Sequence, residues 1–168
     1  MKHPAVFLDR DGIINKHRND YVKNLNEFEI LNDVPYYLKK LRDLGFKLII
    51  ITNQSAINRG LTTLEQVKQM HEFLEEELKR DDCYIDGIYL CPHRPDENCD
   101  CRKPKTKLFL EAAKKHNIDL IGSWVIGDSE TDIEAGTRIG CRTIKIDTNG
   151  SLEEAVEIIA RSLTENQC

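Results

Sequence analysis

Aspartates, a threonine and a lysine, residue types that can take part in catalysis, follow short apolar runs in this 168-residue sequence. Close carboxylates repel one another unless a cation joins them, and oxygen-rich sites suit a hard ion such as Mg2+. A lysine and a hydroxyl beside such an ion would make a site for a phosphoryl group, whose transfer depends mainly on positioning and on neutralising its oxygens. An aspartate can also attack phosphorus as a covalent nucleophile. The residues in question are Asp9, Asp11, Thr52, Lys103 and Asp128, with Asp132 nearby.

The stretch CPHRPDENCDCRKP at 91–104 places metal ligands directly before two cations, Arg102 and Lys103. Two pairs of soft donors, Cys-x-His and Cys-x-Cys, suit tetrahedral Zn2+. Four protein ligands leave no open coordination position, so the sequence predicts a structural zinc in a loop at 91–101. That loop would hold the two cations at the mouth of the site; a reduced, metal-free loop is the alternative. The predicted ligands are Cys91, His93, Cys99 and Cys101.

The elements that must position these residues alternate along the chain. Strands alternating with helices predict an α/β fold, a doubly wound (Rossmann-like) parallel sheet with helices on both faces and no large cap domain. Ligands of such folds bind beyond the carboxyl ends of the strands, which is where the polar clusters fall. The expected strands are 5–8, 48–51, 87–90, 123–126 and 143–146. The expected helices are 33–44, 63–79, 106–116, 129–139 and a C-terminal helix after Ser151.

Helix signals support these ranges. Thr63 with Gln66, and Ser151 with Glu154, have the spacing of a capping box. The polar segment 14–27 predicts a loop with little regular structure. Apolar residues at helical spacing predict buried faces, and they are Leu38, Leu41 and Leu44 in the first helix and Val67, Met70, Leu74 and Leu78 in the second.

Composition narrows the class of protein. The chain is 40% hydrophobic and 32% charged, which suits one globular domain spanning 1–168. Its net charge of −5, with basic residues scattered among acids, disfavours a nucleic-acid partner. No apolar run approaches the roughly 20 residues of a membrane span, and the start MKHPAVFLDRDG does not resemble a signal peptide. We therefore expect a cytoplasmic monomer, in which clustered cysteines favour a metal over disulfides and the isolated Cys83, Cys141 and Cys168 need no special role.

Sequence motifs from Phe7 to Asp132 resemble those of the haloacid dehalogenase superfamily of phosphatases. The motifs are FLDRDG, IIITN, the lysine of CRKP, and VIGDSETD. The resemblance implies that Asp9 attacks phosphorus and that Asp11 acts as general acid and then base. It also implies that Mg2+ is bound by Asp9, the backbone carbonyl of Asp11, and Asp128, with Asp132 in support, while Thr52 and Lys103 hold the phosphoryl oxygens.

Within that superfamily, the segment TNQSAINRG at 52–60, the Asp20-Tyr21-Val22 stretch and the cysteine loop resemble the D-glycero-D-manno-heptose 1,7-bisphosphate phosphatases. The implied reaction is Mg2+-dependent removal of the 7-phosphate of this sugar phosphate. Two departures from the pattern are Ile13, where many relatives have Thr, and Ser129, where many have Lys or Arg. The expected substrate contacts are Asn53, Gln54, Ser55, Arg59 and Arg102.

Two other functions remain open. Histidinol-phosphate phosphatases share the cysteine loop, and Asp20 and Glu27 could bind the ammonium and imidazole of that substrate. A zinc-containing binding module without catalysis is the alternative from another class, although the intact set of acidic residues argues against it. His3, His71 and His116 are expected to be surface or helix residues without chemistry.

Overall fold

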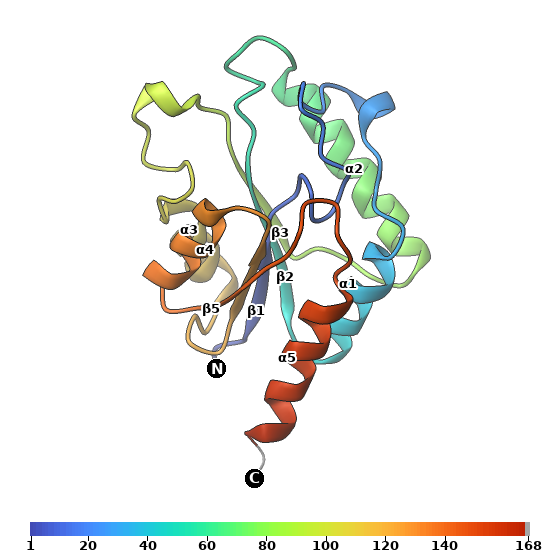
Figure 1. Ribbon diagram of the computed structural model, residues 1–168, viewed down its shortest axis with the longest axis vertical. Coiled ribbons are helices and arrows are strands. Elements are labelled where there is room, and N and C mark those ends of the chain that lie inside the picture. Colours follow the sequence, from blue (N-terminus) through green and yellow to red (C-terminus); the bar gives the residue numbers. More distant parts are fainter. Residues whose placement is uncertain (167–168) are drawn as a thin grey trace.

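Five parallel strands form one sheet in the computed structural model, which describes residues 1–166 (Figure 1). Their order across the sheet is β3-β2-β1-β4-β5. The chain therefore starts in the middle, winds outward to one edge and crosses back to the other, as the predicted doubly wound topology requires. The strands are β1 (Ala5–Leu8), β2 (Lys47–Asn53), β3 (Gly87–Cys91), β4 (Trp124–Gly127) and β5 (Arg142–Lys145).

Helices cover both faces of this sheet (Figure 1). One face is covered by α1 (Val34–Asp43), α2 (Leu64–Arg80) and α5 (Glu153–Glu165). The other is covered by α3 (Lys107–His116) and α4 (Glu130–Arg138). Two single turns, η1 (Leu25–Glu27) and η2 (Pro95–Glu97), lie in the connections that follow β1 and β3. The predicted α/β class is confirmed, and each predicted strand and helix is found with its ends displaced by at most a few residues.

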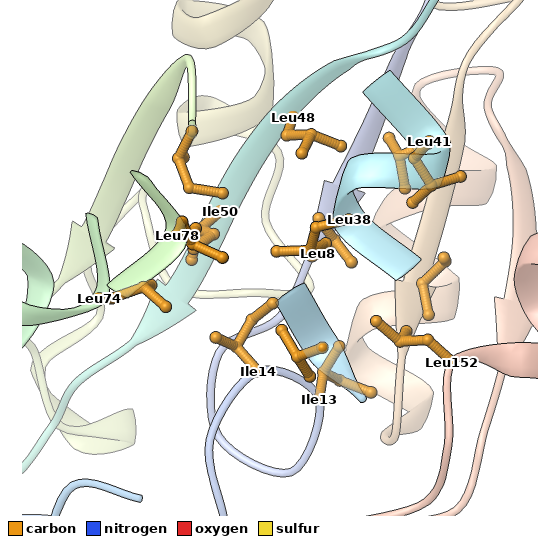
Figure 2. Packing of buried hydrophobic residues seen from close by; sticks show 14 of the residues in the cluster. Leu8, Ile13, Ile14, Leu38, Leu41, Leu48, Ile50, Leu74, Leu78 and Leu152 are labelled. Carbon is orange, nitrogen blue, oxygen red and sulfur yellow. The ribbon is translucent and has the colours of Figure 1, made fainter. Parts of the chain in front are cut away.

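The two faces have separate hydrophobic cores because side chains alternate along each strand. In β1, Val6 and Leu8 face α1, α2 and α5, whereas Ala5 and Phe7 face α3 and α4. Such strands are buried on both sides, so they read as unbroken apolar runs. Figure 2 shows the larger core, where Leu8, Leu38 and Ile50 meet side chains from α2 and from the 13–14 turn.

The helix predictions are mostly confirmed, with two corrections. The four apolar residues predicted for α2 are fully buried, as are Leu38 and Leu41. Leu44 is 37% exposed, because α1 ends at Asp43 and the chain then turns away through Gly45, at φ +96°. The capping-box prediction for Ser151 is also wrong. Leu152 is the N-cap of α5, and the Ser151 hydroxyl accepts from the amide of Glu153 instead.

Other predictions have mixed outcomes. Thr63 does cap α2, since its hydroxyl accepts from the Gln66 amide at 3.2 Å. In segment 14–27 the only regular helix or strand among the described residues is η1. His71 is a helix residue as expected but is buried, not on the surface. Cys168 lies outside the described residues. None of the helices in residues 1–166 is both long and apolar enough to cross a membrane.

Candidate active site

The carboxyl ends of the four strands β3, β2, β1 and β4 open on one cavity of about 350 Å3. Thr52 does not line it but lies fully buried beneath it, in contact with Gln54. The fold thus brings together residues that are up to 123 positions apart in the sequence, from Asp9 to Asp132. Of the predicted site residues, those lining the cavity are Asp9, Asp11, Asn53, Gln54, Ser55, Arg59, Arg102, Lys103 and Asp128, together with Asp132.

Lys103 forms the centre of the site. Its Nζ donates to Asp9 Oδ1 at 2.9 Å and to the Ile51 carbonyl at 2.7 Å, and lies 2.7 Å from Asp132 Oδ1. Burial opposes the charge of this side chain, but Asp9 and Asp132 outweigh it and raise the pKa of Lys103 above its usual value. The ammonium therefore stays charged although its side chain is only 3% exposed.

The backbone of Lys103 is held as firmly as its side chain. Asn53 Oδ1 accepts from the Lys103 amide at 3.1 Å, and Asn53 Nδ2 donates to the Lys103 carbonyl at 3.4 Å. The next peptide bond, to Pro104, is cis. Asn53, expected from the sequence to contact substrate, thus uses its amide here to join the end of β2 to the segment that carries the lysine.

Asp9 stands at the end of β1 with its Oδ1 accepting from the Arg10 amide at 2.8 Å as well as from Lys103. Burial, and then the neighbouring charges of Asp132 and Asp11, raise the pKa of Asp9 to about 7 against the opposing effect of Lys103. A bound cation would stabilise the charged form of Asp9, because it would offset the repulsion from the neighbouring carboxylates.

Asp128, in the turn after β4, and Asp132, in the first turn of α4, have different partners. The Asp132 carboxylate contacts Lys103 through Oδ1, and its Oδ2 accepts from the Ser129 amide and hydroxyl at 3.3 and 2.9 Å. Ser129 is thereby the N-cap of α4 in a reciprocal capping box. Asp128 Oδ2 accepts from Thr148 Oγ1 at 2.8 Å. Both oxygens of Asp132 are thus engaged, whereas Asp128 has a hydrogen bond to one.

Two glycines allow the acidic residues to approach closely. A Cβ on Gly127 would lie 2.3 Å from Asp132 Cβ. A Cβ on Gly12 would lie 2.4 Å from Asp128 Oδ2, and Gly12 also has φ +85°, which other residues rarely adopt. Larger residues would push the carboxylates out of the site.

The carboxylates of Asp9, Asp128 and Asp132 place oxygens within 4.8 Å of one another. In the part of the chain described, Asp9 Oδ2 and Asp128 Oδ1 have no hydrogen-bond partner, although both residues line the cavity. Hard, partly free carboxylate oxygens are the donors that Mg2+ prefers. The donor set therefore fits a magnesium ion better than a soft metal.

The Asp11 side chain is not part of this acidic cluster. Its Oδ1 accepts from Arg10 and Asn15, both at 3.0 Å, and its Oδ2 accepts from Gln54 at 2.8 Å. Burial alone would raise the pKa of Asp11, but the Arg10 charge and these hydrogen bonds outweigh it and lower the pKa. The carboxylate is thus held in one orientation at the rim of the cavity.

The four predicted zinc ligands come together in the loop that follows β3. His93 Nδ1 lies 3.4 Å from Cys91 Sγ and 3.2 Å from Cys101 Sγ, and the Cys91 and Cys99 sulfurs are 3.6 Å apart. Zn–S bonds of about 2.3 Å and Zn–N bonds of about 2.0 Å would place the nitrogen roughly 3.5 Å from each sulfur and the sulfurs roughly 3.8 Å from one another around a tetrahedral ion. The Cys91 and Cys101 sulfurs are closer, at 2.7 Å, so the group would open slightly around an ion.

The chemistry of these donors also suits zinc. Burial opposes ionisation of Cys99, but amide hydrogen bonds from Arg102 and Cys101 outweigh it and lower the pKa of that thiol to about 7. A thiolate is the form that binds metal. The Arg102 amide lies 3.4 Å from Cys99 Sγ, one residue before Lys103. The cysteine group and the central lysine are therefore parts of one continuous segment.

The two predicted arginines line the cavity. Arg59 Nε donates to Ser55 Oγ at 3.3 Å, and its guanidinium lies 5.7 Å from the centre of the Tyr21 ring. Arg102 Nη1 donates to the His93 carbonyl at 3.3 Å. Both side chains line the cavity and keep donors for an anion.

Two residues that orient the aspartates of the site were not singled out from the sequence. Thr148, which holds Asp128, follows the edge strand β5 in a segment without a recognisable motif. Arg10 lies inside the first motif, but its side chain is fully buried and contacts Asp11. The only available signal for Arg10 was its place between two candidate aspartates.

The fold and the site define a hydrolase of the haloacid dehalogenase class. A family model for such hydrolases, described as HAD-hydrolase-like, matches residues 100–165. The crystal structure of D,D-heptose 1,7-bisphosphate phosphatase from B. bronchiseptica, complexed with magnesium and phosphate, superposes with a TM-score of 0.86. That protein is 28% identical, over 98% of this chain and 99% of its own.

Curated relatives narrow the class. A D-glycero-β-D-manno-heptose-1,7-bisphosphate 7-phosphatase of Helicobacter pylori (strain J99) is 51% identical over 79% of this chain and 76% of its own length. One of the same name from Photorhabdus laumondii is 38% identical over 96% of this chain and 92% of its own. The chain belongs to this heptose-bisphosphate phosphatase family.

Proposed function

We propose that this chain is a Mg2+-dependent phosphatase that removes the 7-phosphate of D-glycero-D-manno-heptose 1,7-bisphosphate through a phosphoaspartyl intermediate on Asp9. The observation that carries the proposal is the buried Lys103 ammonium, which bridges Asp9 and Asp132 at the floor of a cavity lined with anion-binding donors. The relatives of the same name and the related structure with magnesium and phosphate support it.

The first half of the reaction follows from the placement of Asp9. Asp9 lines the cavity and attacks phosphorus through its free Oδ2, while Lys103 holds the phosphoryl oxygens. Thr52, the other residue expected to hold them, is fully buried and accepts from Gln54, so Gln54 would have to move before the hydroxyl could reach the phosphoryl group. Magnesium held by Asp9, Asp128 and the Asp11 carbonyl would neutralise charge on those oxygens. Asp132 keeps Lys103 oriented and is not a direct ligand, because both of its oxygens are already engaged.

Asp11 serves both halves of the reaction. As the bond from phosphorus to the sugar oxygen breaks, the Asp11 carboxyl gives that oxygen a proton. The resulting carboxylate then takes a proton from the water that attacks the phosphoaspartate. The low pKa of Asp11 in the free enzyme favours the second role, and an incoming phosphate dianion raises the pKa toward the first.

We propose one structural zinc per chain, held by Cys91, His93, Cys99 and Cys101. Cys99→Ser should weaken zinc binding and lower kcat/KM by about tenfold, because loosening the loop displaces Lys103 from the phosphoryl group. Metal analysis of protein purified without added zinc, followed by phosphate-release assays, measures both effects.

Cys141→Ser is the matched control, since Cys141 is an isolated cysteine outside the loop. It should keep the zinc and the activity. Loss of zinc from Cys99→Ser with full activity and unchanged melting temperature would refute a positioning role for the loop.

The second phosphate of the proposed substrate explains the two arginines. Arg59→Ala should lower kcat/KM for the bisphosphate by about 10- to 100-fold, the worth of a charged hydrogen bond. Turnover of the corresponding 7-monophosphate should change little, because it has no group for Arg59 to bind. The comparison requires initial rates for both substrates at one Mg2+ concentration, with Arg80→Ala, at the far end of α2, as control.

Histidinol phosphate is the second candidate substrate. Its ammonium and imidazole would need acidic partners, and Asp20 and Glu27 are the available ones. Both are already paired with Arg18 and Lys23, which favours the sugar bisphosphate. Faster turnover of histidinol phosphate than of the bisphosphate by the unmodified protein would reverse this assignment.

A further inference from the structure

Arg10 separates the two aspartates of the first motif, yet it does not line the cavity. It is the largest fully buried side chain in the described structure and packs against α2, beside Met70 and His71. Phe28 lies under the guanidinium, 5.3 Å from ring centre to Arg10 Cζ. A charged side chain in this position needs a partner for each of its donors.

Each nitrogen of the guanidinium does have a different partner. Nε donates to Asn15 Oδ1 at 3.1 Å, Nη2 donates to Asp11 Oδ1 at 3.0 Å, and Nη1 lies 3.2 Å from His71 Nε2. Asn15 in turn donates to the same Asp11 oxygen. Arg10 therefore reaches Asp11 both directly and through Asn15.

His71 must be the acceptor in its contact with Arg10, because a guanidinium has donors only. The imidazole is neutral for the same reason. Burial, reinforced by the Arg10 charge, lowers the pKa of His71 to about 3. His71 does not line the cavity, so it has no direct contact with a substrate bound there.

Stability alone does not explain this arrangement. A buried charge network is often no more stabilising than apolar side chains of the same size. The network instead has a directional consequence: Asp11 is turned toward Arg10, Asn15 and Gln54 and away from the acidic metal cluster. Its carboxyl group is thereby kept for proton transfer.

We propose that Arg10, locked by His71 of α2, is a positioning residue that aims the Asp11 carboxyl at the leaving-group oxygen of the substrate. The inference rests on the proposed function, in which Asp11 gives a proton to that oxygen as its bond to phosphorus breaks. In this arrangement His71 fixes the rotation of the Arg10 guanidinium, and the guanidinium in turn fixes the orientation of the Asp11 carboxyl group.

The test compares a sugar phosphate, whose alkoxide needs a proton to leave, with p-nitrophenyl phosphate, whose phenolate leaves readily without one. Asp11→Asn should lower kcat/KM far more for the sugar phosphate. His71→Leu removes the acceptor and should show the same bias to a smaller extent: a loss of about tenfold for the sugar phosphate and less than about twofold for the aryl phosphate. His71→Gln, which keeps an acceptor oxygen near the position of Nε2, should recover most of the loss.

Leu74→Val, on the same buried face of α2, is the control for lost packing. It should lower the melting temperature without any bias between substrates. Arg10→Lys provides a second variant, measured in the same way, should His71→Leu fail to fold. This variant keeps the positive charge but cannot contact Asn15, Asp11 and His71 at once, so it should lose more activity with the sugar phosphate than with the aryl phosphate.

The outcomes separate the two hypotheses. Bias in Asp11→Asn but none in His71→Leu or Arg10→Lys would overturn the positioning role and leave the proposed function intact. Equal losses on both substrates in Asp11→Asn would overturn the acid role of Asp11, and the positioning role with it. A failure of His71→Gln to recover activity would show that volume, not the acceptor, is what matters.

Discussion

Asp9→Asn should abolish steady-state phosphate release, with a loss of at least about 1,000-fold, while leaving the fold intact. An amide is a poor nucleophile and a weaker magnesium ligand than a carboxylate. The fold should tolerate the change because burial, reinforced by the charges of Asp132 and Asp11, disfavours the native carboxylate and raises the pKa of Asp9 to about 7 against the opposing effect of Lys103. A neutral amide of the same shape is buried at a lower cost.

Phosphate release and a thermal melt, both with and without Mg2+, measure this prediction. The melting temperature of Asp9→Asn should be equal to or higher than that of the unmodified protein without Mg2+, and should gain less from the ion. Appreciable turnover by purified Asp9→Asn would exclude a phosphoaspartyl mechanism at this residue. Asp20→Asn, an exposed aspartate on the loop after β1, serves as a control for the substitution itself.

Lys103→Met should lower kcat/KM by about 100- to 1,000-fold, the effect of losing one charged donor to a transition state. It should also destabilise the protein. Lys103 Nζ lies 2.9 Å from Asp9 Oδ1 and 2.7 Å from Asp132 Oδ1, so its loss leaves two buried carboxyl groups facing each other without a cation. Breaking a buried pair in this way costs about 3 to 5 kcal/mol of unfolding free energy.

The size of that loss should depend on pH. The folded pKa of Asp9, about 7, is above its unfolded value, so the folded state holds a proton that the unfolded chain releases. Stability from this group therefore falls as pH rises from about 4 toward 7. Lys103 lowers the pKa of Asp9, so in Lys103→Met the fall should extend to higher pH, and the variant should be closest to the unmodified protein in mild acid.

Denaturant unfolding at pH 5 and pH 8 without divalent ions measures this dependence. Lys145→Met, which breaks an exposed ion pair with Glu130, is the control and should show no such trend. The repulsion argument would be contradicted if the stability difference between Lys103→Met and the unmodified protein were the same at both pH values.

The sheet was predictable because its strands are buried on both faces. AVFL and WVI are apolar without a break, and an aspartate follows each run where the strand leaves the core, Asp9 directly and Asp128 after one glycine. Helical spacing identified the buried face of α2 in full. Leu44 was mispredicted because spacing alone does not show where a helix ends, and it lies one residue beyond the end of α1.

The sequence by itself determined the class of chemistry. The sequence places carboxylates, a lysine and a hydroxyl at strand ends, together with a closed set of four zinc donors. To predict a phosphoryl-transfer site from them, we needed only the rule that parallel strands end at one edge of the sheet. The sequence did not determine what each side chain does there. Asn53, expected to contact substrate, lines the cavity, and its amide also holds the backbone of Lys103.

The tertiary structure alone decided the partners that orient the site. Thr148, in the loop after β5, contacts Asp128. His71, in α2, contacts Arg10 although the two residues are 61 positions apart in the sequence. Neither pairing has a local pattern, because hydrogen-bond direction depends on how α2 and the β5 loop pack against β1 and β4. A motif names residue types at fixed spacing along the chain, whereas the rotation of a carboxyl group is set by neighbours from distant segments.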